Sequence, residues 1–167
     1  WKQVDLGARS TDLRRVIFAP SDPSTVYVVA PSGEIYVSND SGHAWVTRLI
    51  TGAAMETEEP FVQSDSLIMD FDVDPVAGGG LYAVWRLRAV FKSADGGSSW
   101  AMIGKKNQAG RGVHGVVADQ ACRGTIYGRE YRALIRSVDR GKHWKLINDG
   151  LPVYRNRDWV YVEDLLG

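Results

Sequence analysis

The stretch Ser38-Asn39-Asp40-Ser41-Gly42-His43-Ala44-Trp45 decides the fold, because the chain of 167 residues uses its pattern three times. The pattern is Ser-x-Asp-x-Gly-x-x-Trp, and it returns at residues 93–100 and 137–144. Each copy follows a short apolar run and comes before another one. Two apolar runs joined by a segment of turn-forming residues are typical of a β-hairpin. The repeats therefore predict three hairpins at equivalent places in three similar units.

The four recurring residue types suit a tight turn. Ser and Asp side chains accept hydrogen bonds from backbone N–H groups a few residues further on. Gly supplies a positive φ, and Trp opens the next strand with a large apolar side chain. Because the acid recurs in every unit, a structural role is favoured over catalysis or metal binding. The structural residues are Ser38, Asp40, Gly42, Trp45, Ser93, Asp95, Gly97, Trp100, Ser137, Asp139, Gly141 and Trp144.

Around each hairpin, the apolar alternation predicts four short antiparallel strands. The expected strands are 13–19, 25–30, 34–38 and 44–50, then 67–73, 81–85, 89–92 and 99–103, then 113–118, 125–129, 133–137 and 143–147. Four such strands form one blade of a β-propeller, so the expected fold is all-β.

Three blades do not close a ring, since propellers have about 4–8 blades. We therefore expect a partial propeller with one strand of a neighbouring blade at each end. Its parts are the last strand of a preceding blade at 1–10, a blade at 11–50, an inserted loop at 51–66, a blade at 67–104, a blade at 112–148 and the first strand of a next blade at 159–167.

The composition excludes several classes of function. The 20 basic and 20 acidic residues balance, so no nucleic acid or anionic membrane partner is expected. The sequence contains no run of about 20 apolar residues, so membrane insertion is not expected. Cys122 is the only cysteine, and His43, His114 and His143 lack the spacing of metal ligands. We therefore expect no disulfide within the chain, no metal and no cofactor.

The repeated motif resembles the Asp-box, or BNR repeat, of sialidase-type β-propellers. Similar boxes occur in sortilin-like propellers, xyloglucanase-type glycoside hydrolases and a photosystem II assembly factor. The lead-in at 16–27, Val-Ile-Phe-Ala-Pro-Ser-Asp-Pro-Ser-Thr-Val-Tyr, also resembles that family. The resemblance covers nearly the whole chain and implies the propeller fold. In the family the boxes lie on outer turns, away from the active site, and export from the cell is implied by analogy alone.

A second group of residues is predicted to face a binding partner. Connections between strands two and three, and between blades, lie on the face where propellers generally bind ligands. Arg and aromatic side chains gather there, and they suit carboxylates, phosphates or a protein anchor. A solvated loop surface is the alternative. The predicted rim residues are Trp85, Arg86, Arg88, Arg129, Tyr131, Arg132, Arg155 and Arg157.

The acids outside the hairpins give little support for catalysis. The run of Glu and Asp within 51–66 lacks the rigid frame that a pair of glycosidase carboxylates needs. Asp70 and Asp72 share a face of one strand and are expected to be structural, although they could line the channel, and Asp74 is expected in a turn. A sialidase signature is missing, because Ile17-Phe18-Ala19-Pro20 stands in its place.

Three functions stay open on these grounds. The first is a non-catalytic scaffold that binds a protein partner, or the remaining blades of the same propeller, through the rim. The second is part of a carbohydrate-active propeller that binds or hydrolyses a glycan, with some of its acids outside this segment. The third is a structural repeat with no ligand of its own.

Overall fold

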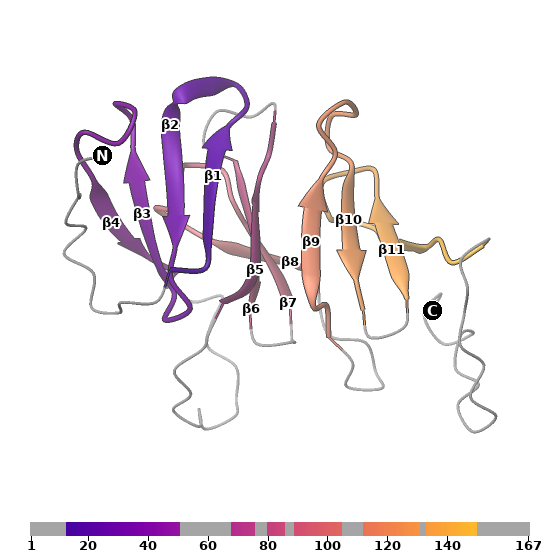
Figure 1. Ribbon diagram of the computed structural model, residues 1–167. Helices are drawn as coiled ribbons and strands as arrows, with labels where there is room; N and C mark the ends of the chain where they lie inside the picture. The colour runs from indigo at the N-terminus through magenta and orange to yellow at the C-terminus, as the bar shows by residue number, and fades with distance from the viewer. Residues whose placement is uncertain are drawn as a thin grey trace.

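The computed structural model describes residues 13–50, 68–75, 80–85, 89–104, 112–130 and 133–149. Within these ranges the chain forms strands and no helix. The strands make three four-stranded antiparallel sheets (Figure 1). The first sheet contains β1 (Arg15–Ala19), β2 (Asp22–Val29), β3 (Glu34–Ser38) and β4 (Val46–Leu49). The prediction of an all-β chain of four-stranded blades is thereby confirmed.

The second and third sheets repeat the same strand order. The second contains β5 (Ile68–Val73), β6 (Leu81–Trp85), β7 (Ala89–Ser93) and β8 (Ala101–Gly104). The third contains β9 (Gly115–Ala118), β10 (Ile126–Arg129), β11 (Leu134–Ser137) and β12 (Lys145–Leu146). The expected strands at 1–10 and 159–167, and the expected loop at 51–66, lie outside the described residues.

Most strand boundaries agree with the predicted ones to within two residues. The exception is β2, which begins at Asp22 rather than Thr25 because Asp22 pairs with Ala19 across a bulge in β1. The predicted place of each Trp was also wrong. Trp45, Trp100 and Trp144 stand one residue before their strands, because each indole N–H donates to the carbonyl of the hairpin Gly and stays in the turn.

The sheets pack face to face, with their first strands β1, β5 and β9 side by side (Figure 1). One core cluster joins the first two sheets and contains Tyr27, Phe71 and Trp100. A second cluster joins the second and third sheets and contains Tyr82 and Val116. The second sheet is therefore covered on both faces, which explains why every residue of β6 is buried although the sheet is antiparallel.

The three hairpins share one set of hydrogen bonds. In the first, Ser38 Oγ accepts from Gly42 N at 2.8 Å and donates to Asp40 Oδ1 at 2.7 Å. Asp40 Oδ1 also accepts from Ala44 N at 2.8 Å. The second and third hairpins repeat the Ser–Gly and Ser–Asp bonds. The Gly φ values are 89°, 91° and 87°, a region that favours glycine, so the recurring residues close the turns locally.

Low pH should weaken the hydrogen bonds that close these turns. Hydrogen bonds from Ser99, first its hydroxyl and then its N–H, and from Ser93 hold the pKa of Asp95 below its usual 3.8. A carboxylate with a lowered pKa stabilises the fold above its unfolded-state pKa, and this contribution is lost as the pH falls through the folded-state pKa. We expect the melting temperature to fall below pH about 4, and to fall less steeply in Asp95→Asn.

Thermal unfolding followed by circular dichroism between pH 2 and pH 6 measures this difference. Asp149→Asn is the matched control, because Asp149 is an exposed acid outside the hairpins. Equal pH slopes in Asp95→Asn and in the unmodified chain would contradict the assignment.

Candidate functional site

Each blade has two ends, and the hairpins define one of them. The turn between the first two strands lies beside the hairpin of the same blade. Ser41 N donates to Ser24 O at 2.8 Å in the first blade, and Arg140 N donates to Gly124 O at 2.8 Å in the third. The starts of β1, β5 and β9 and the ends of β6 and β10 lie at the opposite end. We call this opposite end the rim.

A charged network joins the three inner strands near the rim. Arg15 of β1 donates from Nη1 to Asp70 Oδ1 at 2.8 Å and to Phe71 O at 2.7 Å. The other carboxylate oxygen of Asp70 accepts from Val116 N of β9 at 3.0 Å. One side chain from each of two strands therefore links three blades.

Asp72 continues the network one step along β5. Its Oδ2 accepts from Ala118 N at 2.8 Å, and its Oδ1 lies 3.9 Å from Arg15 Nη2. Burial raises the pKa of Asp72, and the hydrogen bond from Ala118 N opposes that rise. Alternate N–H groups of an inner edge strand need partners, and carboxylates two residues apart match that spacing. Asp70 and Asp72 thus accept hydrogen bonds from two backbone N–H groups on the unpaired edge of β9.

Arg129 stands next to this network. It pairs with Gly115 across β9 and β10. A Cβ on Gly115 would lie 3.0 Å from Asp70 Oδ2 and 3.5 Å from Arg129 Nε. Arg129 is exposed, and the one hydrogen bond of its side chain to another described residue is long, 3.4 Å from Nη2 to His114 O. An exposed guanidinium presents planar donors that suit a carboxylate.

The predicted rim residues fall into two groups. Trp85 and Arg129 end β6 and β10 at the rim. Trp85 is only 6% exposed and lies in the core of the first two blades. Its buried indole N–H has no hydrogen-bond partner among the residues that the structure describes. Arg86, Arg88, Tyr131, Arg132, Arg155 and Arg157 lie outside the described residues.

Sequence reasoning missed Arg15 and treated Asp70 separately from it. Both follow from aligning the repeats on the Tyr of each second strand. Arg15, Asp70 and Gly115 each precede that Tyr, at 27, 82 and 127, by the same number of residues. They face Val29, Val84 and Arg129 in the strand pairing. The same position on three adjacent inner strands is thus a cation in Arg15, an anion in Asp70 and a residue without a side chain in Gly115.

Two further findings concern the described residues alone. They contain no cluster of three or more His, Cys, Asp or Glu residues that could hold a metal ion. They also contain no helix with the length and apolarity that a membrane span requires.

Four-stranded antiparallel sheets that pack face to face, with their first strands side by side, are the blades of a β-propeller. No protein-family model matches the chain, and no curated protein matches it either. Solved structures of propellers do match, among them enzymes of GH74 and the protein YCF48.

An ancestral GH74 enzyme is 13% identical with a TM-score of 0.59, over 81% of this chain and 18% of that one. YCF48 from Cyanidioschyzon merolae is 18% identical with a TM-score of 0.58, over 87% and 39%. A structure of YCF48 bound to D1 peptide is 16% identical with a TM-score of 0.57, over 81% and 40%. The chain thus spans less than half of each, and the likeness shows the fold alone. The finer assignment to Asp-box repeats stays a prediction.

Proposed function

We propose that this propeller segment is a non-catalytic scaffold that binds an acidic segment of a protein partner through its rim. The observation that carries the proposal is the exposed Arg129 guanidinium beside a carboxylate that is already bonded. Asp70 gives one oxygen to Arg15 and the other to Val116 N. Among the described residues, Asp70 forms its ion pair with Arg15 and forms none with Arg129. The charge of Arg129 is therefore available to an incoming carboxylate.

The other predicted rim residues extend the same surface in this proposal. They add Arg86, Arg88, Arg132, Arg155 and Arg157 as further cations, and Tyr131 as an aromatic anchor. Trp85 enters as a rigid support beneath the surface, since its ring is buried. The likeness to YCF48, which one structure holds bound to a peptide, supports a protein partner. Export from the cell stays a prediction by analogy.

Charge reversal at Arg129 tests the proposal. A fluorescein-labelled peptide of alternating Glu and Gly serves as the acidic probe, and fluorescence anisotropy measures its affinity for the full chain. We expect Arg129→Glu to weaken binding about tenfold, because it replaces an ion pair by a repulsion. Joint reversal of Arg86, Arg88 and Arg132 is expected to abolish it.

Lys145→Glu is the matched control, because Lys145 is exposed on the outermost strand β12 and the change in net charge is the same. Equal losses in Arg129→Glu and Lys145→Glu would mean that only net charge matters, and the rim proposal would then fail.

A carbohydrate-active propeller is the second candidate, and one observation favours it. Burial raises the pKa of Asp72, and Asp70 lies two residues away on the same strand. Glycoside hydrolysis uses one protonated and one ionised carboxyl group. A panel of chromogenic glycosides tests the candidate on the full chain. Hydrolysis that Asp72→Asn abolishes would favour this candidate over the scaffold.

A further inference from the structure

The three blades differ in the partner of one tyrosine hydroxyl group. Tyr27, Tyr82 and Tyr127 occupy the same place in their blades, opposite Ile17, Asp72 and Val117 of the inner strands. Tyr82 donates to Asp74 Oδ2 at 3.2 Å, and Tyr127 donates to Asp119 Oδ2 at 3.3 Å. In the second and third blades a turn carboxylate therefore satisfies the phenol.

The first blade lacks that carboxylate. Asp74 and Asp119 each precede their Tyr by eight residues, and the equivalent residue before Tyr27 is Ala19. The nearest turn acid, Asp22, is used elsewhere. It accepts from Ser24 N at 3.1 Å, from Ser24 Oγ at 2.6 Å and from Thr25 Oγ1 at 2.8 Å. Within the described residues, the Tyr27 hydroxyl makes no hydrogen bond.

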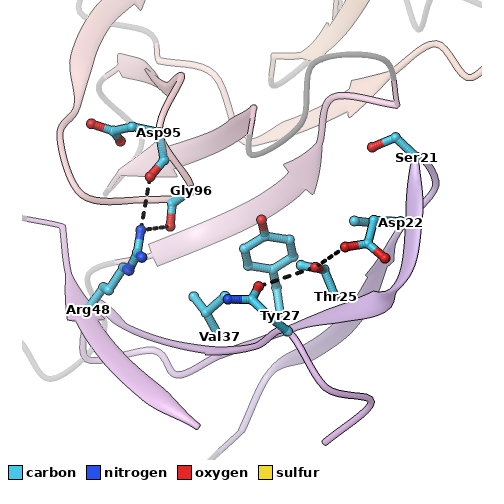
Figure 2. Close-up of a pocket in the computed structure, with 10 residues that line it drawn as sticks. Ser21, Asp22, Thr25, Tyr27, Val37, Arg48, Asp95 and Gly96 are labelled. Atoms are coloured by element: carbon cyan, nitrogen blue, oxygen red, sulfur yellow. Dashed lines mark hydrogen bonds between the residues drawn. The ribbon is translucent and has the colours of Figure 1, made fainter.

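A cavity of about 250 Å³ opens where the carboxylate is missing. Ala19, Tyr27 and Val37 contribute to its walls, together with the hairpin of the second blade. Figure 2 shows the Tyr27 hydroxyl pointing into this space, between the Asp22 side chain and the Gly96 turn. The side chain of Tyr27 is otherwise buried, at 2% exposure. The cavity is several times the roughly 30 Å³ that one water molecule occupies.

A second substitution enlarges the same space. In the second blade Lys92 pairs with Tyr82, and its Nζ lies 5.7 Å from the ring centroid. The first blade carries Val37 at that place, opposite Tyr27. The acid Asp74 and the base Lys92 of the second blade are thus replaced in the first blade by the small apolar residues Ala19 and Val37.

Asp22, Asp95 and the cation Arg48 also line the cavity. The carboxylates of Asp22 and Asp95 accept hydrogen bonds within their own turns, whereas Arg48 lies between the two blades. Arg48 donates from Nη1 to Asp95 O at 2.9 Å, to Gly96 O at 2.6 Å and to Ser98 Oγ at 2.7 Å. These bonds hold its guanidinium beside Tyr27. Burial raises the pKa of Tyr27, with Arg48 opposing and Asp22 adding to the rise, so the hydroxyl stays protonated and can donate a hydrogen bond.

We propose that this cavity binds the carboxylate group of a ligand, which takes the place that Asp74 and Asp119 hold in the other blades. Tyr27 donates a hydrogen bond to the carboxylate, Arg48 supplies the positive charge, and Ala19 and Val37 leave the room. The site lies at the hairpin end, so it is separate from the rim and does not depend on the proposed function.

Acetate is the simplest probe, and titration of the ¹⁵N-labelled full chain measures its binding through the amide signals of Tyr27 and Gly96. We expect acetate to shift these signals in the millimolar range, and acetamide and chloride to leave them unchanged. Ala19→Asp should abolish the shifts without lowering the melting temperature, because it restores the Tyr–Asp bond of the other blades. Tyr27→Phe should weaken binding about five- to tenfold.

Ala121→Asp is the matched control, since it adds the same charge at an exposed turn of the third blade and should leave binding intact. A peptide with a single Asp, blocked at both ends, distinguishes the sources of the carboxylate. Affinity tenfold above that of acetate would identify a protein side chain, and equal affinity a free small acid. Equal shifts with acetate and acetamide would show that the cavity does not select a carboxylate. Full acetate binding by Ala19→Asp would show that acetate binds elsewhere. Either result would overturn the proposal.

Discussion

Replacement of Phe71 by Ala is expected to lower the free energy of unfolding by about 3–5 kcal/mol. Phe71 is 1% exposed and lies in the core between the first and second blades. Its ring centroid is 6.3 Å from that of Tyr27 and 6.5 Å from that of Trp100. The change removes one ring from a three-ring contact that joins two sheets, and urea denaturation followed by tryptophan fluorescence measures the loss.

Phe18→Ala is the matched control for this prediction. Phe18 also lies on an inner strand, β1, but it is 61% exposed. Its replacement should change the free energy of unfolding by no more than about 0.5 kcal/mol. Similar losses in the two variants would contradict the packing of the first blade on the second.

Gly141→Ala should be the second most damaging change, with a loss of free energy of unfolding of about 2–5 kcal/mol. Gly141 has a φ of 87°, and an L-residue costs about 1–2 kcal/mol there. A Cβ would also lie 3.0 Å from Ile103 Cγ1 and 3.1 Å from Ile103 Cβ of the preceding blade. Crowding of this kind costs about 1–3 kcal/mol. Thermal and urea unfolding of the variant measure the sum.

Gly42→Ala separates the two contributions. Gly42 has a similar φ of 89°, but a Cβ there would meet one atom, Trp45 Cζ2, at an ordinary 3.5 Å. Its loss should reflect backbone strain alone. The difference between the two variants then measures the crowding between the blades. Ile103→Ala should relieve this crowding when it is combined with Gly141→Ala. Equal losses at the two glycines would rule out that crowding.

Local features of the fold were predictable from the sequence, because they depend on residues close together in the chain. The hairpins follow from Ser, Asp and Gly within five residues, and the strands follow from apolar alternation next to them. The position of each Trp was mispredicted because its indole N–H bonds back to the turn, a contact that apolar patterning does not reveal.

Contacts between blades were harder to predict. Arg15 and Asp70 are 55 residues apart, and nothing in their immediate neighbours pairs them. The burial of Trp85 depends on two sheets meeting, so a position at a strand end suggested more exposure than the ring has. Alignment of the repeats on their Tyr residues would have found both the Arg15–Asp70 pair and the exceptional Ala19, because a propeller places equivalent positions on neighbouring blades side by side.

The salt bridge between inner strands gives the units a fixed order. Arg15 donates a hydrogen bond to Asp70 of the next unit, and Asp70 accepts one from the backbone N–H of Val116 in the unit after that. Exchanging the second and third units as cassettes would set Arg15 against Gly115, which carries no acid, and would point Asp70 away from the amide it now bonds. The inner strands therefore constrain the order of the three units, even though their hairpins share the same internal hydrogen bonds.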